Sequence, residues 1–114
     1  MRCVSDQPWV TGAETCELVM AAATLDHSRA LQVYADIQHL RDADGAYWTG
    51  WQFANRAHFP AERSSWTAAA MILAADVLSG TTPGSVLFRE IGVEGLALSP
   101  GDPTLCGCPV VITD

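Results

Sequence analysis

The stretch Asp44–Trp66, DGAYWTGWQFANRAHFPAERSSW, gathers aromatic side chains at an unusual density. It holds three of the four Trp of the 114-residue chain, with one of the two Tyr and one of the three His. It also holds an Asp-Gly, a Thr-Gly and a Phe-Pro pair, which are turn signals, so it is expected to be a connection. Connecting segments are mostly polar because they run over the surface. An aromatic connection therefore either lines an apolar cavity or packs as a plug between helices.

The segment before this stretch has the sequence of two helices. Residues 13–25 and 27–41 carry apolar side chains at helical spacing, and Thr11 and Asp26 are placed as their N-caps. Because the two helices are joined by only a few residues, they are expected to pack antiparallel as an αα-hairpin.

The segment after Pro60 predicts a third helix over residues 61–79, which ends at Gly80. From Trp66 to Leu78 only Thr67 and Asp76 are polar. A helix that is apolar almost all round is expected to be buried on nearly all sides. If Asp76 is buried, it needs a partner, with Arg29, Arg41 and Arg89 as the options.

The fold class predicted from these segments is all-α, with residues 1–90 as a helical region and residues 91–114 as an irregular tail. Thr82-Pro83 is expected to open one short helical turn through Phe88. A hydrophobic content of 49% in so short a chain leaves few polar residues to cover its outside. We therefore expect the helices to pack against a second copy or against further helices.

Charge and hydropathy exclude several classes of partner. Thirteen acidic against six basic residues give a net charge of −7, which argues against nucleic acid and anionic membrane surfaces. The longest apolar region, Trp66–Leu78, is shorter than the roughly 20 residues that a membrane-spanning helix needs. The N-terminus lacks the apolar core of a secretory signal, so the expected compartment is the cytosol.

The helix pair, Gln38, the run Asp44-Gly45-Ala46-Tyr47-Trp48 and the following apolar helix together resemble a repeat of the terpenoid cyclase and protein prenyltransferase superfamily. The likeness is to prenyltransferase-like toroid proteins of actinobacteria, and it covers about residues 8–90. The resemblance implies a partial alpha/alpha toroid, the C-terminal portion of a longer protein that begins here at an internal Met.

On function, the resemblance implies a prenyltransferase or terpene cyclase that binds or transforms an isoprenoid or another apolar molecule. The alternative is a non-catalytic helical unit that packs against a partner or a second copy. The resemblance alone does not decide whether the chain is an enzyme, and it names no cofactor.

The candidate substrate-binding residues are aromatic, because ring faces stabilise carbocations. They are Tyr47, Trp48, Trp51, Phe53 and Trp66. The alternative for the same rings is structural, as wedges between neighbouring helices.

The candidate catalytic residues are Asp44, Glu62 and Arg63. The resemblance implies that Asp44, in the pattern Asp42-x-Asp44, is the protonated acid that starts the reaction. An Asp-Gly pair is also an ordinary turn. Glu62 is placed to act as an acid or to orient a substrate, and Arg63 to hold a diphosphate; the alternative is an ion pair between helices that fixes the connection.

No metal site is predicted. Cys106-Gly-Cys108 supplies only two thiolates, no His lies in the tail, and a zinc site of four ligands would need Cys3 and Cys16 from far along the sequence. His58, between Ala57 and Phe59, is expected to be a loop residue.

Overall fold

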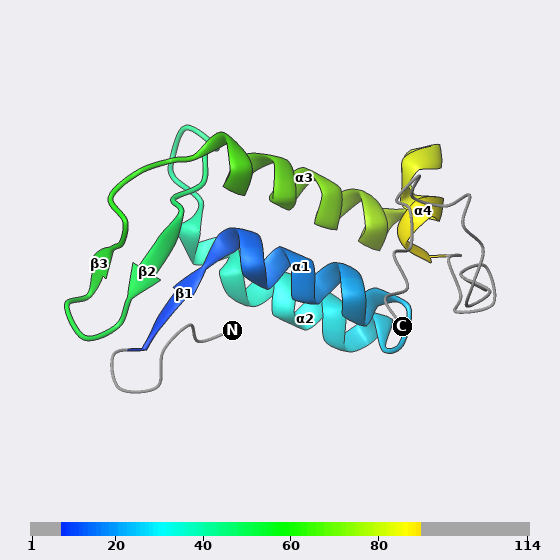
Figure 1. Ribbon diagram of the computed structural model, residues 1–114, viewed down its shortest axis with the longest axis horizontal. Coiled ribbons are helices and arrows are strands. Elements are labelled where there is room, and N and C mark those ends of the chain that lie inside the picture. The colour runs from blue at the N-terminus through cyan, green and yellow to red at the C-terminus, as the bar shows by residue number, and fades with distance from the viewer. Residues whose placement is uncertain (1–7, 90–114) are drawn as a thin grey trace, which may run out of the picture.

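A computed structural model describes residues 8–89 of the chain. Helix α1 (Gly12–Ala23) lies between α2 (His27–Asp36) and α3 (Ser65–Ser79), and it contacts both (Figure 1). The helices α1 and α2 form the antiparallel hairpin that the sequence predicts. A 3-10 helix, η1 (Ile37–Leu40), extends the end of α2.

The helix boundaries follow from local chemistry. Asp26 caps α2, because its carboxylate accepts a hydrogen bond from the backbone N–H of Arg29 at 2.9 Å. Helix α3 begins at Ser65 and not at residue 61, because Ser64 supplies the cap and accepts from the N–H of Thr67 at 3.2 Å. It ends at Gly80, which takes the left-handed conformation with φ of 64° that glycine tolerates.

A small antiparallel sheet, which the sequence does not predict, lies at one end of the helices (Figure 1). Its strands β1 (Trp9–Thr11), β2 (Gly50–Gln52) and β3 (Ala57–His58) follow one another in that order. The prediction of an all-α fold is therefore right for the helices and wrong for the aromatic connection, part of which is a hairpin. Strands of two or three residues are too short to show a period of two in the sequence.

Gly50 permits the close approach of the strands. A Cβ at this position would lie 2.5 Å from the carbonyl oxygen of Val10 and 2.7 Å from that of Phe59. Both neighbours are backbone atoms, so no flexible side chain can yield. The Thr-Gly pair, a turn signal in the sequence, is in the structure the point at which three backbone segments meet.

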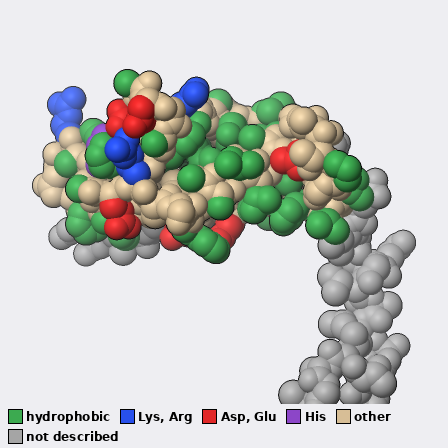
Figure 2. Space-filling view, turned by 90° about the horizontal axis from the view of Figure 1, so that it is seen from above, with side chains coloured by type: hydrophobic (Ala, Val, Ile, Leu, Met, Phe, Trp, Pro, Cys, Tyr) green, Lys and Arg blue, Asp and Glu red, His purple; other side chains and the backbone are tan. Residues whose placement is uncertain are grey.

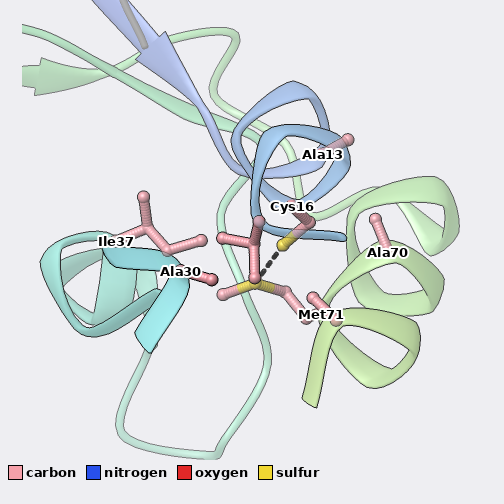
Figure 3. Packing of buried hydrophobic residues seen from close by; sticks show 8 residues of the cluster. Ala13, Cys16, Ala30, Ile37, Ala70 and Met71 are labelled. Atoms are coloured by element: carbon pink, nitrogen blue, oxygen red, sulfur yellow. Dashed lines mark hydrogen bonds between the residues drawn. The ribbon is translucent and has the colours of Figure 1, made fainter. Parts of the chain in front are cut away.

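The core lies between the three helices, and half of the residues in its buried cluster are alanines (Figure 3). Cys16 of α1 points at Met71 of α3, and the two sulfur atoms are 3.1 Å apart. Ala13, Ala30 and Ala70 surround this pair, and their size lets the helices come close.

Helix α3 buries one face only, which corrects the expectation of burial on nearly all sides. Thr67, Ala70, Met71, Ala74 and Val77 are buried at helical spacing. On the opposite face, Trp66 is 66% exposed and Ile72 is 70% exposed. The described part of the chain contains no ring of helix pairs that would cover this second face.

The chain after α3 turns through Pro83–Ser85, a 3-10 helix (η2), into the short α4 (Val86–Arg89), as the sequence predicts. Asp76 finds a partner other than the three arginines named from the sequence. Its carboxylate accepts hydrogen bonds from both the backbone N–H and the hydroxyl of Thr82, each at 2.8 Å.

Two sequence-based expectations concern residues that are not described. The irregular tail at 91–114 and its pair Cys106 and Cys108 lie outside the described residues.

Within the described residues, no helix has both the length and the apolar character needed to cross a membrane.

Candidate functional site

An arginine between two aspartates marks the surface of the aromatic connection. One nitrogen of Arg63 lies 2.7 Å from Asp44 and 3.3 Å from Asp42. The turn that the Asp-Gly pair predicts brings the two carboxylates together, since the N–H of Gly45 donates to the carbonyl of Asp42 at 3.0 Å and Gly45 has φ of 88°. The turn and the charged cluster are therefore the same structure. We call Asp42 and Asp44 the acidic pair.

The side chains of the acidic pair are open to solvent. The pKa of Asp44 lies below its usual range, first because the N–H of Ala46 donates to its carboxylate and second because Arg63 does so. Its side chain is 59% exposed, so the ion pair adds little to stability. A carboxylate held in the ionised form suits hydrogen bonding to hydroxyl groups better than it suits donating a proton.

A chain of ring contacts runs from Arg63 to His39 in η1. The guanidinium carbon of Arg63 lies 5.5 Å from the ring centre of Trp48, which stacks on His58 at 4.4 Å with an angle of 10° between the planes. His58 meets Trp51 at 5.1 Å, and Trp51 meets His39 at 6.4 Å, both at nearly right angles. We call these five residues the ring cluster.

The hairpin explains why His58 belongs to the ring cluster. Trp51 and His58 are direct partners across β2 and β3, so their side chains stand on the same face of the sheet. Sequence reasoning placed His58 in a loop and did not consider His39. No pattern in so short a hairpin reveals its register, although the aromatic density of the stretch marks the region.

A groove of about 370 Å³ opens beside His39, between β1, α1 and α2. Its apolar wall includes Val33, Ile37 and Phe53, and its polar groups are Arg29, Asp36 and His39. Among residues 8–89, no hydrogen-bond or ion-pair partner holds the carboxylate of Asp36. Phe53, one of the aromatic residues singled out from the sequence, thus lines a groove that mixes apolar surface with charge.

The remaining candidates lie elsewhere. Tyr47 donates its hydroxyl hydrogen bond to Gln38 at 2.7 Å and lines a separate cavity of about 210 Å³ beside α3. Glu62 is exposed and anchored by its backbone, whose carbonyl accepts from the N–H of Thr49 at 2.9 Å. Trp66 is largely exposed and lines a small hollow between α3 and α1 with Glu17 and Met20. The structure thus brings together Asp44, Arg63, Trp48 and Trp51.

No group of three or more His, Cys, Asp or Glu side chains within the described range is arranged to hold a metal ion. The only cysteine in this range, Cys16, is buried against Met71, and burial raises the pKa of its thiol to about 12. Such a thiol is inert as a ligand or nucleophile near neutral pH.

Comparison with known proteins gives one close similarity. No family model matches the chain. A protein of Mycolicibacterium hassiacum, described as an MMP endo-(1,4)-3-O-methyl-alpha-D-mannosidase, is 54% identical over an alignment of 100 residues, and this alignment covers 83% of this chain. The match spans 28% of the length of that mannosidase.

This similarity overturns the resemblance to prenyltransferases and terpenoid cyclases. The expectation of an isoprenoid substrate, and of a transferase or cyclase, was wrong, because the similar protein is a glycoside hydrolase by its description. The physical reason is that aromatic residue types do not identify a ligand. A tryptophan face that can stabilise a carbocation packs equally well against the C–H face of a sugar ring.

Proposed function

We propose that this chain takes part in a glycoside hydrolase that cleaves internal (1,4) linkages in a glycan of 3-O-methyl-α-D-mannose. The observation that carries the proposal is the 54% identity over 100 residues to the M. hassiacum mannosidase. Because the match covers 28% of that protein, we assign to this chain a contribution to the substrate-binding surface rather than the whole reaction.

The acidic pair supports a role in holding sugar hydroxyl groups. Ionised carboxylates accept hydrogen bonds from neighbouring hydroxyls, and such charge-assisted bonds are stronger than neutral ones. Arg63 fixes the orientation of Asp42 and Asp44 and has further N–H groups to donate. Glu62, exposed and next to Arg63 in the chain, is a candidate for a further contact to substrate.

The ring cluster and the groove support a role in binding the apolar parts of a methylated sugar. Trp48 contacts both Arg63 and His58, so it holds the cluster together. Trp51 and Phe53 supply ring surface that remains partly open to solvent.

The groove suits an O-methyl sugar for a specific reason. A methyl ether has lost a hydroxyl donor and gained an apolar group, so it needs an apolar wall beside polar partners. Val33, Ile37 and Phe53 offer that wall, and Arg29 and Asp36 offer the polar partners. A volume of about 370 Å³ lies within the range of roughly 300–1,000 Å³ that is usual for small-molecule sites.

The proton donor of the reaction is assigned outside residues 8–89. Glycoside hydrolysis requires one carboxyl group that is protonated at working pH and one that is ionised. Burial is a usual cause of a raised carboxyl pKa, and no Asp or Glu in the described range is buried. Folding lowers the pKa of Asp44, so Asp44 fits the ionised role, and we assign the acid to a part of the enzyme outside these residues.

Hydrolysis is tested in the M. hassiacum mannosidase after its matching segment is replaced by this chain. We expect the chimera to shorten 3-O-methylated (1,4)-linked α-mannose oligosaccharides, with internal products resolved by mass spectrometry. Asp44→Asn is expected to slow cleavage at least tenfold, whereas Glu14→Gln on the exposed side of α1 leaves the rate unchanged. A folded chimera that cleaves none of these oligosaccharides would contradict the proposal.

A further inference from the structure

The outer face of α3 is apolar along most of its length. Trp66, Ile72 and Leu73 are 66%, 70% and 44% exposed, and the exposed Ala68 and Ala69 lie beside them. Hydrophobic side chains spread over this side of the molecule, which faces the viewer in Figure 2. Between Trp66 and Leu78 the two polar residues are both accounted for, because Thr67 is buried and Asp76 is bonded to Thr82.

Two hollows flank this face. One of about 90 Å³ lies toward α1, between Met20, Trp66 and Leu73. The other, of about 210 Å³, lies toward the aromatic connection, between Tyr47, Ile72 and other residues. The larger side chains of α3 thus stand as a ridge between two grooves, which is the shape into which a second helix packs.

We infer that the outer face of α3 is the docking surface for an apolar helix from the part of the mannosidase that the match to this chain leaves out. The inference rests on the proposed function. In the M. hassiacum protein the aligned region accounts for 28% of the length, so most of that protein lies outside the match.

A second copy fits the same face less well. Each chain carries a net charge of −7, so two copies repel one another at low salt. Glu17 also lies at the edge of the hollow beside Met20, and pairing related by two-fold symmetry would bring two such carboxylates close together.

The test compares one substitution in two settings. Ile72→Glu is introduced into the 114-residue chain and into the chimeric mannosidase described above, and thermal unfolding is measured for both. Leu25→Glu is the matched control, because Leu25 is 89% exposed in the connection between α1 and α2. We expect Ile72→Glu to leave the melting temperature of the isolated chain within about a degree of that of Leu25→Glu, as for surface positions.

In the chimera we expect Ile72→Glu to lower the melting temperature by several degrees while Leu25→Glu does not, because a charge would then be buried without a partner. Equal effects of the two substitutions in the chimera would overturn the inference, and so would a chimera that fails to fold. A large drop in the melting temperature of the isolated chain would overturn the inference as well. The outer face of α3 would then be covered by another part of the same chain or by a second copy, and light scattering distinguishes a monomer from a dimer. Since the readout is stability, a failure here is distinct from a failure to cleave the glycan.

Discussion

Apolar side chains are packed differently in two regions of the chain, the helical core and the aromatic connection. In the core between α1, α2 and α3, small side chains such as Ala13, Ala70 and Ala74 are closed off from water, and they determine how closely the helices pack. In the aromatic connection, large rings stay partly open and are held by one arginine and by short strands. Partly exposed rings bury less apolar surface than the core does. Under the proposed function we assign them to sugar binding.

The largest effect on stability is expected in the core. Met71→Ala removes a side chain that is 2% exposed and contacts Cys16, and we expect the free energy of unfolding to fall by about 2–5 kcal/mol. Chemical denaturation measures this loss. Leu25→Ala, on the surface, is expected to change it by no more than about 0.5 kcal/mol. Equal losses for the two variants would remove the distinction between the regions.

The next largest loss of stability is expected in β2, where the aromatic connection packs against β1. Gly50→Ala forces a methyl group against the carbonyls of Val10 and Phe59, and we expect a loss of about 1–3 kcal/mol. Gly84→Ala is the control, because the nearest atom to its added Cβ is a side-chain oxygen 3.2 Å away. We also expect Gly50→Ala to shift the NMR signals of Trp51 and His58. Unchanged signals and stability would show that the hairpin does not hold the ring cluster.

A third effect, absent at neutral pH, is expected from the core at high pH. Burial raises the pKa of the Cys16 thiol from 9.0 to about 12, so the folded state keeps a proton that the unfolded state releases. Stability from this group is fully present below pH 9.0 and is lost as the pH rises toward 12. We expect Cys16→Ala to flatten the fall in stability over this range in urea titrations. An unchanged slope would show that the thiol is not protected.

The smallest effect on stability is expected at the acidic pair. Arg63→Met breaks two exposed ion pairs, and we expect the free energy of unfolding to change little, because solvent screens such pairs. The pKa of Asp44 is expected to rise yet stay below 3.8, because the hydrogen bond from Ala46, the larger cause of the lowering, remains. A carboxylate NMR titration measures it.

The same titration gives the sign of the acid dependence. Because folding lowers the pKa of Asp44, its contribution to stability is present above pH 3.8 and is lost as the pH falls through the folded value. A pKa of 3.8 or above in Arg63→Met would contradict the assignment to Ala46.

The helices could be predicted from the sequence because their signals are local. Asp26 and Gly80 carry their own capping chemistry, and the apolar period of residues 13–79 places α1, α2 and α3. The burial of α3 could not be predicted, because its sequence shows only that both faces are apolar. Which face is covered depends on the neighbours that are present.

The candidate site could be predicted only in part. The Asp-Gly turn and the aromatic density mark the surface on which Asp44, Arg63, Trp48 and Trp51 lie together. The place of His58 in the ring cluster depends on its pairing with Trp51 across β2 and β3. The exposure of Trp66 depends on which face of α3 packs against the other helices. Neither is encoded by spacing alone. The ligand class was misjudged because ring faces serve several chemistries.

The most direct test of the account uses the tryptophans as internal reporters. Oligosaccharides of (1,4)-linked 3-O-methyl-α-D-mannose are titrated into the ¹⁵N-labelled chain, and the indole N–H signals are followed by NMR. We expect the signals of Trp48 and Trp51 to shift with saturation while that of Trp66, on the outer face of α3, stays in place. If only the signal of Trp66 shifts, or if none does, the ring cluster is not the sugar-binding surface.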